Sequence, residues 1–331
     1  MTSLNRTTLN LYCAGGSAIN LGRSFNQYRG QSNDGYADIN TYFIDTSRSN
    51  MDPDVPEAAT FLFDGVDGKG GSGKVRNANY PEIAERSPEI LHKFKPSAVN
   101  VVLHSASGGS GSAIGPVLVS EMLARGEMVI VLMVGSTSSK KEIENTVNTF
   151  KSYESISAKR GAPVVAYYRE NSTDMSRGEV DKQIQLALVL LATLFSGQNR
   201  ELDMADLRNF INYQKVTSYA PHLVCLDFFS KEIKLEAGEN LLTVASLTNQ
   251  SAPTELSIPT EYQAVGFLPE TMKDAIKLDL PVHACVLSGH FNTAMKRLEN
   301  KLKVYSDLRT TVVEKSIVSA SDSSTPDGLV F

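Results

Sequence analysis

One apolar stretch constrains the fold of this chain more than any other feature. Between Asp181 and Asp206, residues 186–192 form an uninterrupted apolar run, and the apolar character continues to Phe195. A helix that is apolar all round is buried on all sides, so the pattern predicts a central core helix. The run is far shorter than the ~20 residues that a membrane span requires, and we expect no membrane partner.

Acidic residues flank the predicted core helix at both ends. Asp181 opens it, and Asp203 and Asp206 follow shortly after its end. At about 1.5 Å rise per residue, the mostly helical segment from Asp181 to Asp203 would hold the two acidic ends roughly 30 Å apart. A function that uses both ends would therefore reach across a whole domain or across two molecules.

The length and composition are typical of a globular protein with two domains. The chain has 331 residues, 41% of them hydrophobic and 21% charged, and such a chain can bury a sizeable core. The net charge of −5 comes from interspersed charges without a Lys/Arg block, so direct binding of nucleic acid is not expected. Three isolated cysteines and the absence of a signal-peptide pattern favour a reducing, cytoplasmic location.

The order of apolar segments predicts an α/β fold with a doubly wound, mainly parallel sheet. Continuous apolar strands separated by helices are typical of a parallel sheet that is covered on both faces. After the core helix the pattern changes to that of a smaller α/β domain with a mixed sheet. The predicted parts are a first domain over 1–177, the core helix over 178–198, a second domain over 199–288, a long C-terminal helix over 289–315 and a flexible tail over 316–331. In the first domain we expect strands over 8–13, 39–45, 60–64, 99–104, 128–134 and 163–168 and helices over 116–125 and 140–155.

Three glycine-rich segments each follow a predicted strand of the first domain. They cover residues 15–17, 68–73 and 108–112. Ligands of α/β sheets bind at the carboxyl ends of the strands, and glycines let backbone amides approach an anion at a helix N-terminus. Three such loops on one sheet predict a phosphate-binding site.

Two common phosphate motifs fit this chain poorly. Residues 68–74 satisfy most of the Walker A spacing, but Val75 stands where a Ser or Thr is required, and the residues that follow do not predict a clean helix. Gly109, Gly111 and Gly115 are spaced GxGxxxG, whereas the dinucleotide fingerprint is GxGxxG. We therefore expect neither a P-loop nor a dinucleotide fold.

Ser110 lies at a predicted strand–turn–helix corner, where a hydrolase nucleophile would lie. The GxSxG pattern is not met, and no histidine is paired with Ser110 by sequence. A non-polymerising, nucleotide-dependent α/β enzyme and a serine hydrolase that uses Ser110 remain the alternatives.

Three segments resemble those of the tubulin/FtsZ superfamily. S-G-G-S-G-S over 107–112 resembles the GGGTGSG signature, and A-G-G-S-A-I-N over 14–20 is similar to the first nucleotide loop of FtsZ. E-L-D-M-A-D-L over 201–207 is similar to the FtsZ catalytic loop N-V-D-F-A-D-V, although Glu201 stands where FtsZ has Asn. The short chain with one long C-terminal helix looks most like the phage-encoded tubulins of the PhuZ group.

The resemblance implies that the first domain is a GTP-binding domain. It would bind GTP or GDP together with Mg²⁺, for which no protein ligand can be named. The residues implied are Gly15, Gly16 and Ser17 at the phosphates, Asn20 at the guanine or ribose, Gly70, Gly71 and Gly73 near the γ-phosphate, Gly108, Gly109, Ser110, Gly111 and Ser112 at the α- and β-phosphates, and Asn171 and Asp181 at the guanine.

The resemblance also implies a GTPase that depends on assembly. Asp203 and Asp206 of one subunit would polarise the water that attacks GTP held by the next subunit. A head-to-tail contact of the chain with itself that does not close gives a filament. In this interpretation the filaments form a spindle-like cytoskeleton that positions phage DNA in the infected bacterium, with an indirect association with phage DNA or capsids.

The C-terminal residues lead to two further expectations. The tail carries only Asp322 and Asp327 as acidic residues and ends in Leu329, Val330 and Phe331. In a contact with a neighbouring subunit, these last three residues would supply apolar contacts. We expect the long helix to pack mainly on the second domain. A filament contact through its basic residues is secondary: Lys296, Arg297, Lys301 and Lys303.

Overall fold

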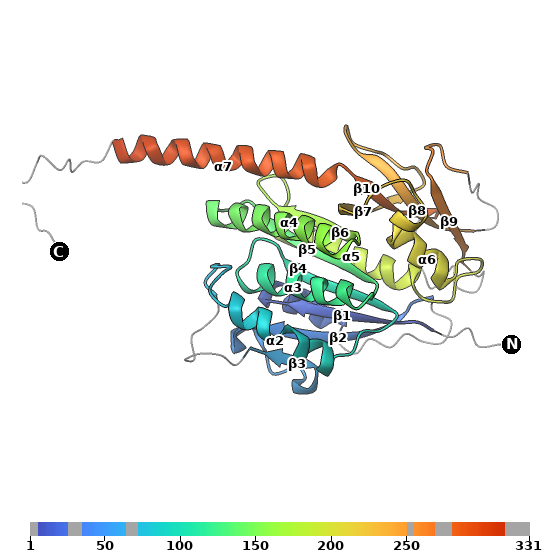
Figure 1. The fold of residues 1–331 in the computed structure, drawn as a ribbon, viewed down its shortest axis with the longest axis horizontal. Helices are drawn as coiled ribbons and strands as arrows, with labels where there is room; N and C mark the ends of the chain where they lie inside the picture. Colours follow the sequence, from blue (N-terminus) through green and yellow to red (C-terminus); the bar gives the residue numbers. More distant parts are fainter. Residues whose placement is uncertain (1–5, 26–34, 64–71, 250–254, 269–279, 315–331) are drawn as a thin grey trace, which may run out of the picture.

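A single ten-stranded sheet runs through the chain (Figure 1). The computed structural model describes residues 6–25, 35–63, 72–249, 255–268 and 280–314, with side chains described up to residue 307. The strand order is β3-β2-β1-β4-β5-β6-β7-β10-β8-β9. The strands are β1 Thr8–Ala14, β2 Asp38–Asp45, β3 Thr60–Leu62, β4 Val99–Ser105, β5 Val129–Ser136, β6 Val164–Asn171, β7 Leu223–Ser230, β8 Asn240–Thr248, β9 Tyr262–Phe267 and β10 Val282–Ser288.

The sheet is parallel from β3 to β7 and mixed beyond β7. Strand β10 is antiparallel to both of its neighbours, β7 and β8, whereas β8 and β9 are parallel. The mixed part that the sequence predicts is therefore present. It continues the parallel part edge to edge, because β6 and β7 are paired from Val164–Leu223 to Ala166–Cys225. The predicted α/β class with a mainly parallel sheet is confirmed.

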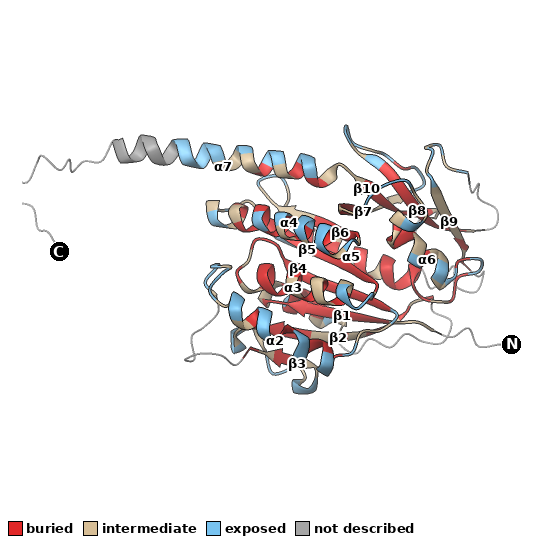
Figure 2. Ribbon diagram, viewed as in Figure 1, coloured by how far each residue is buried: buried red, intermediate tan, exposed pale blue. Residues whose placement is uncertain are grey.

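Helices cover both faces of the sheet. One hydrophobic cluster joins α1, α5 and α6 to one face, and a second joins α2, α3, α4 and α7 to the other. All residues of β4 and of β5 are buried, as expected for strands with helices on both sides (Figure 2). The helices are α1 Gly16–Gly22, α2 Tyr80–Lys93, α3 Ser110–Ala124, α4 Lys140–Arg160, α5 Arg177–Leu194, α6 Met204–Ile211 and α7 His290–Glu314.

Helix α3 begins at Ser110, six residues before the predicted start at Pro116. A proline inside a helix removes one backbone hydrogen bond and leaves a carbonyl without its donor. In α3 the carbonyl of Ser112 accepts a hydrogen bond from Arg76 Nε at 3.1 Å. A tertiary contact thus offsets the local cost, and the first turn of α3 contains the end of the signature segment.

Helix α2 is an element that the sequence analysis did not predict. The residues directly after Val75 form turns rather than a helix, as expected, and α2 begins only at Tyr80. Pro81 lies in its first turn, where a missing N–H has little cost. The apolar residues Ile83, Ile90 and Leu91 bury one face of the helix.

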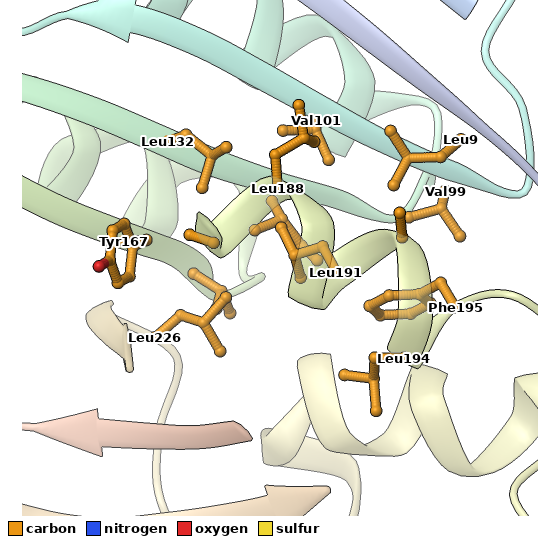
Figure 3. Close-up of a cluster of buried hydrophobic side chains, with 14 of the residues drawn as sticks. Leu9, Val99, Val101, Leu132, Tyr167, Leu188, Leu191, Leu194, Phe195 and Leu226 are labelled. Atoms are coloured by element: carbon orange, nitrogen blue, oxygen red, sulfur yellow. The ribbon is translucent and has the colours of Figure 1, made fainter. Parts of the chain in front are cut away.

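Helix α5 is the predicted core helix, but only its last turn, from Leu190 to Leu194, is buried on all sides. Leu188, Leu191, Leu194 and Phe195 pack against strand residues of the parallel sheet (Figure 3). Near the middle of the helix Leu186 is 53% exposed, so the expectation of complete burial is wrong there. The sheet covers this part from one side, and the other side faces solvent (Figure 2).

Helix α5 runs antiparallel to the parallel strands. Its end lies beside the amino end of the sheet, where Thr7 N donates to Ser196 O at 3.1 Å and Ala37 N donates to Ala192 O at 2.8 Å. Its start is fixed by a capping box in which Ser176 and Glu179 exchange hydrogen bonds with the backbone. The beginning of α5 therefore lies toward the carboxyl ends of the strands.

Helix α7 lies against α4 and β7 and then projects beyond the body of the molecule (Figure 1). The rings of Phe150 and Phe291 are 4.9 Å apart at their centroids, and Lys151 Nζ lies 3.5 Å from Glu299 Oε1. The expectation that α7 packs mainly on the second domain is wrong, since α4 belongs to the first. The predicted tail over 316–331 lies outside the described residues, and no described helix is long and apolar enough to cross a membrane.

Candidate functional site

The glycine segments of the first domain meet at the carboxyl edge of the sheet. A Cβ on Gly15 would lie 2.8 Å from Gly111 N, and one on Gly111 would lie 2.7 Å from Ala14 O. A Cβ on Gly109 would lie 3.1 Å from Lys74 Cα. The structure therefore brings together the segments around Gly15, Gly73 and the signature, whereas Gly70 and Gly71 lie outside the described residues.

Two helices open at this edge without a side-chain cap. The N-cap residues of α1 and α3 are Gly15 and Gly109, and neither helix has a capping side chain. By contrast, Ser139 accepts a hydrogen bond from Glu142 N at the start of α4, and Ser176 caps α5. Uncapped amides at a helix N-terminus, together with the helix dipole, attract anions. The first turns of α1 and α3, which contain Gly16, Ser17, Gly111 and Ser112, therefore suit phosphate groups.

Ser110 contacts other hydroxyl groups. Its Oγ lies 2.7 Å from Thr46 Oγ1, and it donates to Ser72 Oγ at 3.3 Å. His104, which precedes the signature segment, is buried, and its Nε2 lies 2.6 Å from Tyr153 Oη. Burial lowers the pKa of His104 to about 4. No hydrogen bond joins Ser110 to an imidazole among the described residues, so the geometry gives no support to a serine hydrolase.

Asp45 is a site residue that the sequence reasoning missed. It ends β2 beside Ser110, its side chain is almost fully buried, and it accepts hydrogen bonds from Asn50 Nδ2 at 3.0 Å and Thr46 N at 2.7 Å. Burial, which outweighs these hydrogen bonds, raises the pKa of Asp45. An acidic residue directly after an apolar strand was the signal that could have identified it.

The residues around Asp45 fit a Mg²⁺ ion bound together with a nucleotide. Mg²⁺ prefers oxygen ligands and is usually held by one or two carboxylates, waters and substrate phosphates. The Asp45 carboxylate and the Thr46 and Ser110 hydroxyl groups supply such oxygens beside the α3 N-terminus. The described residues contain no separate cluster of three or more metal-binding side chains.

Replacing Asp45 with asparagine is expected to stabilise the nucleotide-free protein at neutral pH. A carboxyl whose folded pKa is raised contributes stability below its unfolded pKa of about 3.9, and this contribution is lost as the pH rises through the folded pKa. The melting temperature of Asp45→Asn relative to wild type should therefore increase between pH 4 and pH 7. Asp174→Asn, in the exposed loop before α5, is the control and should show no such trend.

The three candidates for guanine recognition lie on separate elements of the first domain. Asn20 is exposed on α1, and Asn171 ends β6, where its Nδ2 donates to Ser136 Oγ at 3.3 Å. Asp181 lies in the second turn of α5, 3.9 Å from Arg177, and partial burial raises its pKa although Arg177 opposes this. The described contacts do not join these three side chains to one another.

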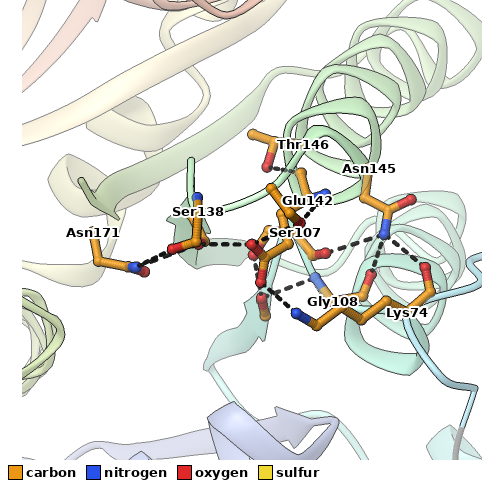
Figure 4. Close-up of polar contacts among 11 residues, drawn as sticks. Lys74, Ser107, Gly108, Ser138, Glu142, Asn145, Thr146 and Asn171 are labelled. Atoms are coloured by element: carbon orange, nitrogen blue, oxygen red, sulfur yellow. Dashed lines mark hydrogen bonds and ion pairs between the residues drawn. The ribbon is translucent and has the colours of Figure 1, made fainter. Parts of the chain in front are cut away.

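Asn145 of α4 binds two of the glycine segments together (Figure 4). Its Nδ2 donates to the carbonyl oxygens of Lys74 at 3.0 Å, Ser107 at 3.1 Å and Gly108 at 3.2 Å. The side chain is buried, so these bonds are shielded from water. Sequence reasoning missed Asn145, because nothing local marks a polar residue on the buried face of a helix.

Asp203 and Asp206 form a capping box at the start of α6. Asp203 Oδ1 accepts from Ala205 N at 2.7 Å and from Asp206 N at 3.0 Å, and Asp206 Oδ2 accepts from Asp203 N at 3.2 Å. Tyr262 Oη donates to the other oxygen, Asp206 Oδ1, at 3.1 Å. Both aspartates therefore have a local structural role, and Tyr262 orients Asp206. The neighbouring Glu201 adopts a φ of 61°, which is uncommon for a residue with a side chain.

The two aspartates, at the start of α6, and the glycine segments lie at opposite ends of the parallel strands. The end of α5, which leads into α6, is hydrogen-bonded beside the start of β1, whereas Gly15 follows the end of β1. A seven-residue strand spans about 23 Å at 3.3 Å per residue. Within one molecule the acidic residues and the phosphate-binding edge therefore do not meet.

Known proteins resemble this chain over nearly its whole length. No protein-family model matches the sequence. A phage tubulin-like protein of Pseudomonas phage phiKZ is 27% identical over 99% of both chains. A solved protofilament of TubZ from phage phiKZ matches with a TM-score of 0.78 and 24% identity, covering 98% of this chain and 99% of that one. The resemblance to the tubulin/FtsZ superfamily, and within it to phage tubulins, is confirmed.

A second solved structure supports the same phage-tubulin-like fold. The phage tubulin PhuZ with GDP matches with a TM-score of 0.82 and 20% identity, covering 98% of this chain and 99% of that one. At this level of identity the two solved structures show the fold. The roles of individual residues depend on the geometry of this chain.

Proposed function

We propose that this phage-tubulin-like chain binds GTP, assembles head to tail and hydrolyses GTP at the interface between subunits. One observation carries the proposal: the phosphate-binding edge and the α6 aspartates face opposite ends of one sheet. The two halves of the site are far apart within one subunit. The site is completed only when the α6 aspartates of one subunit lie against the phosphate-binding edge of another copy. A heterologous contact of this kind repeats without closing and gives a filament.

The nucleotide would lie across the carboxyl ends of β1, β4 and β5. The first-turn amides of α1 and α3 would bind its phosphates, and Asn145 would hold the signature backbone in place beneath them. Asp45, with the Thr46 and Ser110 hydroxyl groups, would hold Mg²⁺. The ion would neutralise negative charge on the phosphates. Asn20, Asn171 and Asp181 would recognise the guanine, and the PhuZ structure with GDP supports a guanine nucleotide.

Hydrolysis would need α6 of the neighbouring subunit. Asp206, held by the Tyr262 hydroxyl, would orient the attacking water and accept its proton, and Asp203 would hold the loop and add negative charge. Positioning of water and acceptance of a proton are the main requirements of phosphoryl transfer to water. GTPase activity would therefore depend on assembly.

The cellular role that we infer is that of a cytoskeletal filament in the cytoplasm of an infected bacterium. The solved protofilament of TubZ supports self-association as the mode of action. Filaments of this chain would position phage DNA, through an indirect association with the DNA or with capsids. The last residues, 329–331, which lie outside the described part, would contact the next subunit.

Turnover of GTP is expected to show a threshold in protein concentration. Below the threshold, dilute monomers should bind GTP and hydrolyse almost none, because no neighbour supplies Asp206. Above it, the rate per subunit should rise together with light scattering, and electron microscopy should show filaments. Turnover strictly proportional to protein down to high dilution, without scattering, would instead support a non-polymerising nucleotide-dependent enzyme.

A further inference from the structure

Lys74 lies against the signature segment. A Cβ on Gly109 would lie 3.1 Å from Lys74 Cα, and Ser110 donates to Ser72 Oγ at 3.3 Å. The Lys74 carbonyl accepts from the same Asn145 amide that binds Ser107 and Gly108 (Figure 4). The main chain of Lys74 is thus attached to the loop on which the phosphates would lie.

The backbone of Lys74 is held in an unfavourable conformation. Its φ is 64°, in the left-handed region that a lysine rarely adopts. The turn is closed by a hydrogen bond from Val75 N to Ser72 O at 2.8 Å. Backbone strain of this kind persists where the surrounding structure over-determines it, and it occurs often at functional sites. At this position the strained backbone carries the cationic side chain of Lys74 and lies directly beside the phosphate-binding loop.

The Lys74 side chain has a partner from which it can separate. Its Nζ lies 2.8 Å from Glu142 Oε1, and the lysine side chain is 58% exposed whereas that of Glu142 is 13% exposed. The other oxygen, Glu142 Oε2, accepts hydrogen bonds from Ser139 Oγ at 3.0 Å and from Ser136 Oγ at 3.3 Å. If Lys74 moves away, Glu142 keeps these two donors, so the separation does not leave an unpaired buried charge. Because the Lys74 ammonium is exposed to water, its attraction to Glu142 is weakened, and the cost of separating the two is modest.

We propose that Lys74 distinguishes a nucleoside triphosphate from a diphosphate by exchanging Glu142 for the γ-phosphate, the terminal phosphate of the triphosphate. This inference rests on the proposed function and assigns a residue whose contacts differ between bound GTP and bound GDP. A lysine ammonium on a flexible four-carbon stem binds phosphate as a point charge and can move between two anions. The terminal phosphate carries more charge than a carboxylate, so the triphosphate displaces Glu142. The diphosphate lacks this group, and Lys74 stays on Glu142.

The test measures binding of GTPγS and of GDP, each with Mg²⁺, at protein concentrations below the assembly threshold. Lys74→Met keeps the stem and the backbone strain but removes the charge. It should weaken GTPγS binding about tenfold, the loss expected for one charged hydrogen bond, and leave GDP binding within about twofold. Lys74→Arg should restore most of the preference. Lys141→Met is the matched control. Lys141 is an exposed lysine next to Glu142 in the sequence, pairs with Glu144, and should change neither affinity when replaced.

Glu142→Gln tests the exchange itself. Removal of the negative charge of Glu142 should strengthen GTPγS binding about threefold, the gain expected when Lys74 no longer has to leave a weak ion pair. This gain should vanish when Lys74→Met is also present. Equal weakening of both nucleotides by Lys74→Met would show that Lys74 only shapes the loop, and no weakening would show that it does not read the phosphate. An unchanged or weaker GTPγS affinity in Glu142→Gln would overturn the exchange. Wild-type protein that binds neither nucleotide would contradict the proposed GTP function instead.

Discussion

Replacing Asp206 with asparagine is expected to reduce GTP turnover about 100- to 10,000-fold, the range over which a positioned general base acts. Binding of GTP should persist, because Asp206 lies at the opposite end of the sheet from the glycine segments of its own subunit. Assembly should persist as well, because asparagine has nearly the same size and shape as aspartate. The asparagine carbonyl can still accept from Asp203 N and preserve the capping box, so the melting temperature should change little. The measurements are phosphate release, nucleotide binding and light scattering. Polymers that persist long after GTP is added are the expected result.

Tyr262→Phe is the companion variant to Asp206→Asn. It removes the hydroxyl group that donates to Asp206 Oδ1 and leaves the carboxylate in place. We expect a smaller decrease in turnover than for Asp206→Asn, with assembly unchanged. If Asp206→Asn hydrolysed GTP at the wild-type rate, the assignment of Asp206 as the catalytic base would be wrong.

A mixture of two variants tests whether Asp206 acts on the neighbouring subunit. Asp206→Asn keeps an intact phosphate-binding edge, and Asp45→Asn keeps an intact α6 but loses the carboxylate assigned to Mg²⁺. Each alone should be nearly inactive. In mixed filaments some interfaces combine the intact edge of one variant with the intact α6 of the other, so turnover should recover. A mixture as inactive as its components would show that both groups act within one subunit.

Replacing Gly15 or Gly111 with alanine is expected to weaken GTP binding about 100-fold, equivalent to roughly 2.7 kcal/mol. A Cβ on Gly15 would lie 2.8 Å from Gly111 N, and one on Gly111 would lie 2.7 Å from Ala14 O. Both contacts are with backbone atoms, which cannot move aside without shifting the two loops apart. The amides of α1 and α3 would then no longer converge on the phosphates. Titration with a fluorescent GTP analogue below the assembly threshold measures the loss.

Gly126→Ala is the matched control for Gly15→Ala. Gly126 has a φ of 72°, close to the 83° of Gly15, but a Cβ there would meet nothing within 4 Å. It lies in the turn between α3 and β5, at the opposite edge of the sheet. The control should therefore show the effect of backbone strain alone: a loss of about 1–2 kcal/mol in the free energy of unfolding, with normal GTP binding. Equal GTP affinities in Gly15→Ala and Gly126→Ala would contradict the assignment of the phosphate site.

Much of the parallel sheet could be predicted from local patterns. The apolar runs of β4 and β5 have no alternation, because both of their faces are covered, and such runs are readable in the sequence. Helices α2 and α3 were missed or shortened, because prolines and small polar residues lower local helix propensity. Their stability comes from contacts that are distant in sequence, such as that of Arg76 with the Ser112 carbonyl.

Local sequence patterns were sufficient to predict the α/β class, the core helix and the glycine segments that resemble those of tubulin and FtsZ. Each of these features depends on the spacing of residues that are close together in the chain. Contacts between distant residues were needed to show that Asp45 lies beside Ser110, that Asn145 and Lys74 hold the signature loop, and that Tyr262 orients Asp206. Tyr262 lies 56 positions from Asp206 along the chain, and Asn145 lies 71 positions from Lys74 and 38 from Ser107. The direction of α5 also depends on tertiary contacts, because its hydrogen bonds to residues beside the first strands place the aspartates at the end of the sheet opposite the glycine segments.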